Sequence, residues 1–469
     1  MSNSSDVLHV AVFPWLAFGH LIPFARLAIC LAQKGFKVSF ISTPRNLRRI
    51  LKISPHLSSV VSLVGVSLPP VDGLPVAAEA SSDVPYNKQQ LLKKAFDSLE
   101  PQLADLLRDL NPDWIIYDYA SHWISPLAAE LGISSVFFSL FTAGFLAFLG
   151  PPSELSNGGG SRSTVEDFMN DPEWMPHGSN LRFRYHELKT SLDGAIGNES
   201  GTTDSVRFGV SIEESVAVAV RSSPELEPES FDLLTKLYQK PVIPIGFLPP
   251  LMEDVEELSE DIEEWLKKQK ANSVLYVSFG TEAFLRQEDV TELAYGLEQS
   301  EIPFLWILRT SHRNESEMLP AGFKERVSGR GLVHEGWISQ VKVLSHNSVG
   351  GCLTHCGWNS VIEGLGFGRV VIMCPVVNDQ GLNARIMEKK MVGIEIERNE
   401  RDGSFTRDSV SESVRSAMAE GSGGGKLLRE RAMEMKGLFG NGDKNERHLD
   451  KLVDFLETNR KKWQSRGDF

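Results

Sequence analysis

The feature that most constrains the fold is an alternation of short apolar segments with helix-like segments in the first half of the chain. Apolar runs of strand length occupy 9–15, 37–43, 60–68, 114–118 and 135–140, and helical spacing covers about 21–34, 88–110 and 122–131. Strand and helix repeated in this order form a parallel sheet with helices on both faces. We therefore predict a doubly wound α/β fold.

The same alternation begins again after a change of composition near residue 241. Residues 241–260 pass from PVIPIGFLPP to an acidic stretch, which is typical of an interdomain linker that leads into an amphipathic helix. Further apolar runs lie at 274–279, 304–308, 331–334, 350–355, 370–374 and 393–397. We predict two doubly wound halves, with domains at 1–243 and 261–445 joined by a linker at 244–260.

Length and charge are consistent with this organisation. A chain of 469 residues is too long for one ordinary core, and 41% hydrophobic with 23% charged residues is typical of a soluble globular protein. The formal net charge of −14 argues against nucleic acid as a partner, because neutralising phosphates needs clustered Lys and Arg. The basic run RNLRRILK at 45–52 is interpreted as one solvated helix face.

Cysteine usage and the N-terminus favour a cytoplasmic protein. The four cysteines, Cys30, Cys352, Cys356 and Cys374, are spread widely, which suits a reducing compartment. The start MSNSSDVLHVAVF lacks the features of a signal peptide, and no run of about 20 apolar residues predicts a transmembrane segment. The longest apolar stretch, 135–150, reads as a buried strand that leads into a pocket-lining helix. We expect a monomer.

The strongest chemical signal lies between Trp337 and Gln380. Its centre reads as an apolar strand, a glycine turn at Gly357, and a helix opening at Trp358, so that unpaired backbone N–H groups point toward one place. A helix start of this kind binds phosphate. His355, just before the turn, can donate a hydrogen bond to a phosphate oxygen.

The flanks of this segment fit the remaining parts of a nucleotide sugar. Trp337 offers a flat face for a base, and Glu363 can accept hydrogen bonds from ribose hydroxyls. Asp379 and Gln380 form an acceptor and donor pair suited to vicinal sugar hydroxyls, which such a site discriminates strongly. Capping of the following helix by Asp379 is the alternative interpretation. The segment predicts a nucleotide-sugar site.

In order and spacing this segment resembles the signature box of the plant UDP-dependent secondary-product glycosyltransferases, the family 1 enzymes. The matching residues are Trp337, Gln340, His355, Gly357, Trp358, Asn359, Ser360, Glu363, Pro375, Asp379 and Gln380. The opening PWLAFGHLIPF with STPRN is similar to the branch that extends sugars on flavonoid and terpenoid glycosides. Ser339, Cys352 and Arg369–Val371 depart from the pattern, and they bear on local packing because none is an assigned ligand contact.

The resemblance covers nearly the whole chain and implies a GT-B architecture. In that fold two Rossmann-like domains face each other across an interdomain cleft that holds the active site. The N-terminal domain would bind the acceptor and the C-terminal domain the UDP-sugar. The last segment, 446–469, would cross back to the N-terminal domain.

His20 and Asp118 are the predicted catalytic residues. His20 follows the first strand, and a neutral histidine can remove the proton of an attacking hydroxyl. Asp118 ends the strand DWIIYD and could hold the other ring nitrogen, the roles that the resemblance also assigns. Two alternatives stay open: a structural turn histidine, and an Asp118 that caps the helix before Ser121. The single Gly19 at this turn disfavours a dinucleotide enzyme, which needs Gly-x-Gly-x-x-Gly.

The leaving UDP would be stabilised by preorganised donors around the two glycine turns. Ser278 and Thr281 flank Gly280, where the backbone can approach a phosphate closely. By resemblance, Thr142 should touch the sugar 6-hydroxyl and Trp358 should pack on the sugar. The predicted UDP-sugar set is Trp337, Ile338, Gln340, His355, Gly357, Trp358, Asn359, Ser360, Glu363, Asp379, Gln380, Ser278, Thr281, Thr142 and Gly19.

An apolar acceptor pocket is predicted from aromatic residues near the first strands: Trp15, Phe18, Trp123, Phe141 and Phe145. Ordinary core packing is the alternative for each of them. Cys352, His355 and Cys356 have a spacing that resembles a zinc site, but residues 352 and 355 of a strand point to opposite faces. No metal or cofactor is expected, and a Gly-x-Ser-x-Gly hydrolase motif is absent from the sequence.

The leading hypothesis is an inverting O-glycosyltransferase that transfers a sugar from UDP-sugar, preferably UDP-glucose, to a lipophilic small molecule. Flavonoids, terpenoids, their glycosides and phenolic xenobiotics are the acceptor classes that the resemblance implies. The same enzyme using UDP-rhamnose is one alternative. A catalytically silent nucleotide-sugar-binding protein is another, disfavoured because a pure binder needs neither His20 nor Asp118.

Overall fold

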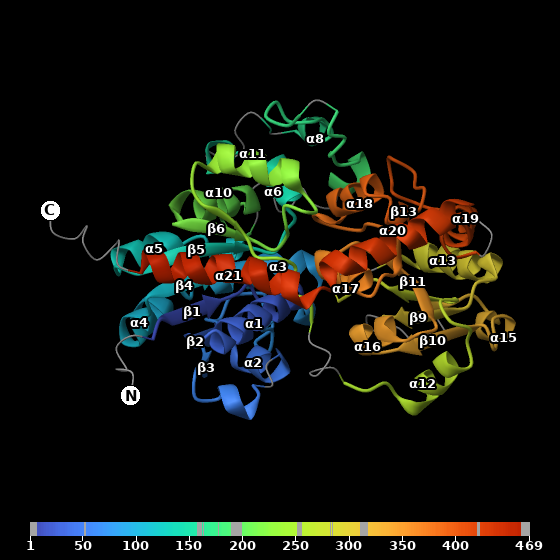
Figure 1. The fold of residues 1–469 in the computed structure, drawn as a ribbon, viewed down its shortest axis with the longest axis horizontal. Helices are drawn as coiled ribbons and strands as arrows, with labels where there is room; N and C mark the ends of the chain where they lie inside the picture. The colour runs from blue at the N-terminus through green and yellow to red at the C-terminus, as the bar shows by residue number, and fades with distance from the viewer. Residues whose placement is uncertain are drawn as a thin grey trace.

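The computed structural model describes residues 7–50, 53–156, 162, 164–176, 178–188, 199–250, 256–281, 283, 285–309, 318–419 and 423–460. Within these ranges the chain forms two parallel β-sheets, one in each half, and each is covered by helices on both faces (Figure 1). The predicted doubly wound α/β fold is confirmed.

The first sheet has seven strands in the described residues, in the order β3-β2-β1-β4-β5-β6-β7. They are β1 (His9–Phe13), β2 (Lys37–Ser42), β3 (Val61–Gly65), β4 (Trp114–Tyr117), β5 (Ser134–Ser139), β6 (Ala217–Val220) and β7 (Val242–Pro244). The last two were not predicted, because β6 has only four residues and β7 has three, one of them a proline. Proline is tolerated in β7 because this strand is at the sheet edge.

The helices of this half connect and cover these strands. They are α1 (Phe18–Gln33), α2 (Pro44–Ile50), α3 (Gln89–Asp97), α4 (Glu100–Leu110), α5 (Ile124–Glu130), α6 (Ala143–Leu149), α7 (Pro152–Ser156), α8 (Val165–Phe168), α10 (Asp204–Glu214) and α11 (Pro228–Tyr238), with 3₁₀ turns η1 (Pro55–Leu57), η2 (Ser81–Asp83), η3 (Tyr86–Lys88) and η4 (Tyr119–Ser121). The helix predicted over 88–110 is divided into α3 and α4, since Pro101 begins a new helix more readily than it continues one.

The second sheet has six strands in the described residues, in the order β10-β9-β8-β11-β12-β13. They are β8 (Val274–Ser278), β9 (Phe304–Leu308), β10 (Gly331–Glu335), β11 (Val349–Thr354), β12 (Val370–Met373) and β13 (Gly393–Glu395). Its helices are α12 (Glu260–Lys267), α13 (Gln287–Ser300), α15 (Phe323–Arg326), α16 (Gln340–Ser345), α17 (Trp358–Gly366), α18 (Gln380–Lys389), α19 (Arg407–Met418) and α20 (Gly423–Phe439). Every strand predicted for this half is present. Residues 251–255 of the predicted linker lie outside the described residues.

Side chains of the central strands alternate between two apolar layers. In β1, Ala11 and Phe13 pack on one face of the sheet, whereas Val10 and Val12 pack on the other. All four are buried, as expected where helices cover both faces of a parallel sheet.

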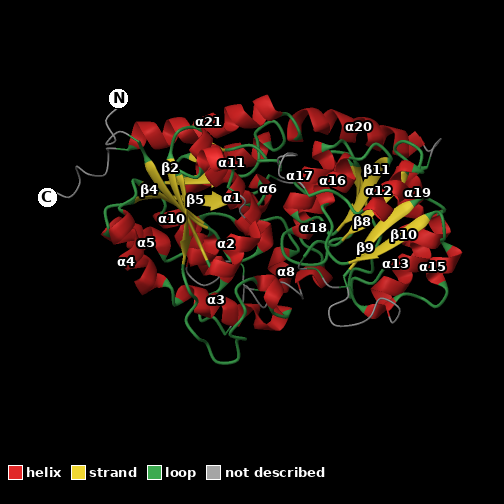
Figure 2. Ribbon diagram, turned by 90° about the horizontal axis from the view of Figure 1, so that it is seen from below, coloured by secondary structure: helices red, strands yellow, loops and turns green. Residues whose placement is uncertain are grey.

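The final helix, α21 (Gly442–Asn459), returns from the second half to the first sheet. Leu449, Leu452, Val453 and Leu456 join the apolar layer that contains Val10 and Val12. Figure 2 shows α21 lying over the first sheet and α20 over the second. The chain therefore passes between the two halves a second time, and α21 packs against the N-terminal half.

Both sheets change winding direction at one point. In the first sheet, the chain passes from β1 to β2 in one direction and from β4 to β5 in the other. In the second sheet, it passes from β8 to β9 and from β11 to β12 in opposite directions in the same way. Ligands of open α/β sheets bind beyond the carboxyl ends of strands at such points. The two switch points therefore place the loops after β1, β4, β8 and β11 where a site is expected.

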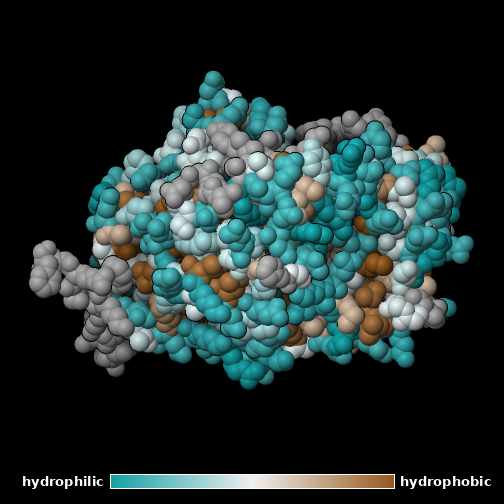
Figure 3. Space-filling view, turned by 90° about the horizontal axis from the view of Figure 1, so that it is seen from above, coloured by the Kyte–Doolittle hydropathy of each residue, from teal (hydrophilic) through white to brown (hydrophobic). Residues whose placement is uncertain are grey.

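One face of the molecule is mainly polar. Figure 3 shows one face on which hydrophilic side chains predominate and hydrophobic ones gather in separate patches. None of the helices in the described ranges combines the length and the hydropathy that crossing a membrane requires.

Candidate active site

A cleft of about 1620 Å³ is lined by residues from both sheets. A single small-molecule pocket has roughly 300–1,000 Å³, so this cleft has room for two ligands side by side. His20 and Tyr119 line it from the first half, and His355, Asn359 and Asp379 line it from the second.

His20 and Asp118 are brought together at the switch point of the first sheet. His20 lies in the first turn of α1, which begins at Phe18, earlier than the predicted start near residue 21. Its Nδ1 is 2.7 Å from Asp118 Oδ2, and the two side chains are 18% and 1% exposed. When Nδ1–H donates to this carboxylate, Nε2 carries the lone pair that a general base needs.

The Asp118 carboxylate is fixed by further donors. Its Oδ2 accepts from the Trp15 backbone N–H at 3.2 Å, and its Oδ1 accepts from the Tyr119 N–H at 2.7 Å. Asp118 therefore caps η4 with one oxygen while the other faces His20. The contact with His20 and the capping contact are both present, because they use different oxygens.

The turn after β11 is packed tightly against the end of β8. A Cβ on Gly280, which has φ +71°, would lie 2.5 Å from the His355 ring, and one on Gly357 would lie 2.6 Å from it. Both positions need glycine because the imidazole fills the space between them. Burial lowers the pKa of His355 to about 4, so its ring is neutral and can donate one N–H to an anion.

The helix predicted at Trp358 is confirmed as α17, and no side chain caps its first turn. Asn359 in that turn donates from Nδ2 to the Gly19 carbonyl at 2.9 Å, next to His20. Its Oδ1 accepts from the guanidinium of Arg221, a buried side chain at the end of β6. Asn359 thus links the two halves of the protein beside His20.

Arg221 was not found from the sequence. Besides Asn359, its guanidinium donates to the carbonyl oxygens of Phe247 and Leu248. Burial lowers its pKa to about 9, which still leaves it protonated at neutral pH. The motif RSSPELEP carries an arginine after a short strand, and only the fold shows that this strand ends opposite α17.

Gln340 and Glu363 form a pair at the second switch point. Gln340 Nε2 donates to Glu363 Oε2 at 2.7 Å and to Ser360 Oγ at 3.3 Å. Burial raises the pKa of Glu363 to about 6. Trp337 stands at the rim of the cleft with 70% of its surface exposed, in reach of a flat ligand group. Ile338, Ser278 and Thr281 also line this part of the cleft.

Asp379 and Gln380 lie at the start of α18. Asp379 occupies the N-cap position without a side-chain bond to the helix backbone, and its Oδ2 accepts from Asn383 Nδ2 at 2.6 Å. Gln380 Oε1 accepts from the N–H groups of Val376 and Val377, both at 2.9 Å. Burial raises the pKa of Asp379 to about 6, and His20 across the cleft acts against this shift.

One residue of the predicted UDP-sugar set lies elsewhere than expected. Thr142 is fully buried away from the cleft, because its hydroxyl caps α6 at Phe145 and lies 3.4 Å from Asn383. Trp358 does line the cleft, and its indole donates to the Arg221 carbonyl at 2.8 Å and packs near Phe247. Both side chains thus contact the opposite half of the protein, but only Trp358 also borders the cleft. Sequence alone gave no signal for Asn383, which joins Thr142 to Asp379.

The departures from the family pattern are explained by packing. Cys352 lies beneath α17, where a Cβ on Gly364 would be 2.9 Å from its sulfur. Arg369 donates to the carbonyls of Leu344 and His346. Among the described residues, no three His, Cys, Asp or Glu side chains come together as a metal-binding group.

The part of the cleft formed by the first half is largely aromatic. Of the predicted residues, Trp15, Phe18, Phe141 and Phe145 line it. Trp123 does not, because its indole donates to Asp97 and packs near Phe13 in the core. Tyr119, Phe168, Phe183, Leu188 and Phe208 also line the cleft and were not identified from the sequence. They lie on separate elements that only folding brings together.

Comparisons with known proteins agree with this geometry. The model of the family described as UDP-glucoronosyl and UDP-glucosyl transferase matches residues 219–451. UDP-glycosyltransferase 91C1 from Arabidopsis thaliana is 57% identical, over 98% of this chain and 98% of its own length. The chain belongs to the plant family 1 UDP-glycosyltransferases.

The chain is also similar to a plant rhamnosyltransferase and to a solved plant glycosyltransferase structure. Soyasaponin III rhamnosyltransferase from Glycine max is 37% identical, over 97% of this chain and 96% of its own length. The structure of Phytolacca americana UGT2 complexed with UDP-2fluoro-glucose and pterostilbene is similar with a TM-score of 0.74 and 26% identity, covering 97% of this chain and 99% of that one. The glycosyltransferase has the GT-B fold and is a hexosyltransferase that takes a UDP-sugar as co-substrate.

Proposed function

We propose that this glycosyltransferase is an inverting O-glycosyltransferase that transfers glucose from UDP-glucose to a hydroxyl of a lipophilic small molecule. Flavonoids, terpenoids, their glycosides and phenolic xenobiotics are the acceptor classes. The observation that carries the proposal is the 2.7 Å contact of His20 with Asp118, opposite Asn359. This contact lies beside an aromatic wall of the cleft, which includes Tyr119, Phe141 and Phe208.

In the proposed reaction, Nε2 of His20 takes the proton of the acceptor hydroxyl as its oxygen attacks the anomeric carbon of glucose. The new C–O bond forms while the bond from that carbon to the β-phosphate oxygen breaks, and UDP leaves with the electron pair. Asp118 stabilises the imidazolium that results. One displacement inverts the anomeric centre, so α-linked UDP-glucose gives a β-glucoside.

The leaving UDP would be stabilised by donors fixed in place before it forms. We assign the diphosphate to the first turn of α17, with His355, Asn359, Ser360 and the turn at Gly280 around it. The positive charge of Arg221 lies behind Asn359 and favours the same developing negative charge. The base and ribose are assigned to Trp337, Gln340 and Glu363.

We assign the hexose to Asp379 and Gln380. An acidic side chain at this place supports glucose over glucuronate, because a glucuronate carboxylate near Asp379 would meet a like charge. UDP-rhamnose is the second candidate donor, favoured by the likeness to the soybean rhamnosyltransferase.

The test is an incubation of the protein with UDP-glucose, UDP-rhamnose, UDP-xylose or UDP-glucuronate and a panel of aglycones and monoglycosides. Mass spectrometry identifies the product, and NMR gives the configuration at the anomeric carbon. We expect β-glucosides from UDP-glucose as the main products. Retention of configuration, or equal rates with UDP-glucuronate, would contradict the proposal. UDP binding without any product would favour a silent nucleotide-sugar binder.

A further inference from the structure

The aromatic wall next to His20 ends in a polar cluster. The Tyr119 ring centroid is 5.9 Å from that of His20, and Lys93 Nζ lies 5.8 Å from the Tyr119 centroid. Phe208 stacks on Tyr119 at 4.4 Å and continues the wall. Tyr119 thus spans the space between the catalytic histidine and the ammonium group of Lys93.

The polar cluster faces the cleft. Lys93 Nζ lies 2.6 and 2.7 Å from the two carboxylate oxygens of Asp204, and these side chains are 7% and 27% exposed. Gln90, one turn before Lys93 on α3, also lines the cleft. Its Oε1 is buried without a hydrogen-bond partner among the described residues. A buried acceptor in this state is costly unless a ligand or water supplies a donor.

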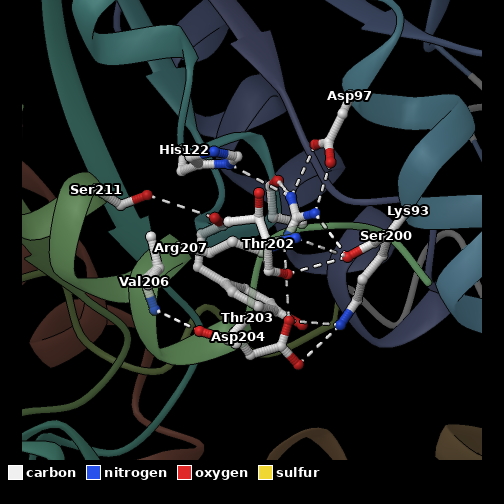
Figure 4. Close-up of polar contacts among 12 residues, drawn as sticks. Lys93, Asp97, His122, Ser200, Thr202, Thr203, Asp204, Val206, Arg207 and Ser211 are labelled. Atoms are coloured by element: carbon white, nitrogen blue, oxygen red, sulfur yellow. Dashed lines mark hydrogen bonds and ion pairs between the residues drawn. The ribbon is translucent and has the colours of Figure 1, made fainter. Parts of the chain in front are cut away.

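A second ion pair, between Arg207 and Asp97, lies beside this cluster and fixes its position (Figure 4). The fully buried guanidinium of Arg207 makes two bonds to Asp97, at 2.7 and 2.5 Å, and one to the Ala120 carbonyl at 2.6 Å. These bonds join α10, which begins with Asp204, to α3 and η4. The positions of Lys93 and Asp204 are therefore set before any acceptor binds.

The charges of the cluster balance. Lys93 and Arg207 carry two positive charges, and Asp97 and Asp204 carry two negative ones. Burial and the charge of Arg207 lower the pKa of the neighbouring His122, which keeps that ring neutral at neutral pH. An added anion would be repelled by Asp204 and an added cation by Lys93. An apolar group would remove water from the pair without replacing its hydrogen bonds.

Hydroxyl groups are the ligands that fit such a surface, because each can donate to a carboxylate or amide oxygen and accept from an ammonium group. Two of the roughly four acceptor positions of the Asp204 carboxylate face Lys93, which leaves capacity for a ligand donor. We propose that Lys93, Asp204 and Gln90 form a subsite for a neutral, hydroxyl-bearing end of the acceptor, opposite the hydroxyl that reacts at His20. This inference rests on the proposed function for what binds in the cleft.

The test compares two acceptors that differ at one end only: resveratrol and its 3,5-dimethyl ether. Both keep the same 4′-hydroxyl for transfer, but only resveratrol has free hydroxyls at the other ring. Calorimetry with the UDP-saturated protein gives the affinity for each, and kcat/KM with UDP-glucose gives the rate of 4′-transfer. We expect the wild-type protein to prefer resveratrol by about 10-fold or more in affinity, as lost bonds to charged groups predict.

Two variants locate the preference. Lys93→Met with Asp204→Asn removes both charges together, so that neither stays buried alone, and Gln90→Leu removes an acceptor on which no other described residue depends. Both should lower the resveratrol preference, to near unity in the double variant, with UDP affinity unchanged. The control neutralises the exposed pair Arg108 and Asp105 on α4 as Arg108→Met with Asp105→Asn.

The outcomes separate this subsite from the function on which it rests. If the variants lose the binding preference for resveratrol but no UDP-sugar supports transfer, the subsite is retained and the proposed function is rejected. Transfer with an unchanged preference in Gln90→Leu and in the double variant overturns the subsite. A wild-type protein that binds both stilbenes equally, or neither, overturns it as well.

Discussion

In the proposed mechanism, His20 is the residue on which the chemistry depends most directly. His20→Ala should lower kcat for alcohol acceptors by roughly 10²–10⁴-fold, because a positioned base is lost. UDP affinity should stay near wild type, since the proposed nucleotide contacts lie on the second sheet. Steady-state kinetics and UDP calorimetry measure both, with the exposed His56 changed to Ala as control.

The acidity of the acceptor hydroxyl determines how large this loss of activity is. A nitrophenol is partly ionised before it binds and should lose less activity in the His20→Ala protein than an alcohol. Near-normal turnover of the alcohol would remove His20 from the mechanism.

A substitution at Gln380 distinguishes binding of the sugar from binding of the nucleotide. Gln380→Ala should lower turnover and the preference for UDP-glucose over other UDP-sugars, while UDP alone binds about as before. Its bonds to Val376 and Val377 also order the loop before α18, so a modest loss of thermal stability is expected. Calorimetry of UDP and of UDP-glucose in the His20→Ala background distinguishes these effects. Unchanged donor preference and turnover would exclude Gln380 from the site.

Asp379 should make stability depend on pH. Its ordinary pKa of 3.8 is raised to about 6 in the folded protein, so between these values the folded side chain keeps a proton that the unfolded chain releases. The contribution of Asp379 to the free energy of unfolding then falls as the pH rises from 4 to 6, by roughly 3 kcal/mol at most, and is constant above that.

Asp379→Asn removes this titration. The Tm of Asp379→Asn minus that of wild type should therefore grow from pH 4 to pH 6.5 and then remain constant. Glu363 titrates in both proteins and cancels in the difference. A difference in Tm that does not vary with pH would contradict the raised pKa.

At the scale of elements, residues 183–188 connect the aromatic lining of the cleft to helix α18. Phe183 and Leu188 line the cleft, whereas Glu187 between them pairs with Arg385 on α18 at 2.8 Å. The contact is close, because a Cβ on Gly381 would lie 2.5 Å from the Glu187 carboxylate. Arg184 forms a second pair across the halves, with Glu395 on β13.

Breaking this pair should therefore affect both substrates. Glu187→Gln leaves the largely buried Arg385 without its charged partner, although its bond to the Gly381 carbonyl remains, and should cost up to roughly 3–5 kcal/mol of stability. It should also raise KM for donor and acceptor together. Adding Arg385→Gln should recover part of both losses, and neutralising the exposed Arg431 and Glu434 on α20 serves as control. Additive losses in unfolding and KM would show that the two side chains are not coupled.

At the scale of the whole molecule, α21 joins the end of the chain to its beginning. Lys34, just after α1, pairs with Glu446 and Asp450, and Asn445 Oδ1 accepts from the Phe247 N–H at 2.7 Å. The apolar side chains beneath α21 belong to the first sheet's own core. We infer that the packing of α21 stabilises the first half of the protein.

Leu452 tests that inference. Leu452→Ala should lower the free energy of unfolding by about 2–5 kcal/mol, because a fully buried side chain leaves a cavity. Urea unfolding measures the loss, with Leu427→Ala as the control, since Leu427 is exposed on α20. A loss no larger than that of the control would mean that α21 contributes little to the first domain.

The sequence by itself determined the two parallel sheets, the strand–turn–helix at Gly357 and the residues placed at strand ends. These are local properties: hydrophobic periodicity, glycine turns and helix starts depend on neighbours in the chain. The pairing of His20 with Asp118 was also predictable, because carboxyl ends of adjacent parallel strands share one edge.

Only the tertiary structure decided which side chains meet across the cleft. Arg221 faces Asn359, Asn383 joins Thr142 to Asp379, and Lys93 meets Asp204. Except for Asn383 and Asp379, which lie one helical turn apart, these partners are separated by more than a hundred residues, so nothing in either segment indicates the other. Trp123 and Thr142 show the same limit, since an aromatic ring or a hydroxyl near a strand end can turn inward or outward. The packing of the surrounding layers, which no single segment contains, makes that choice.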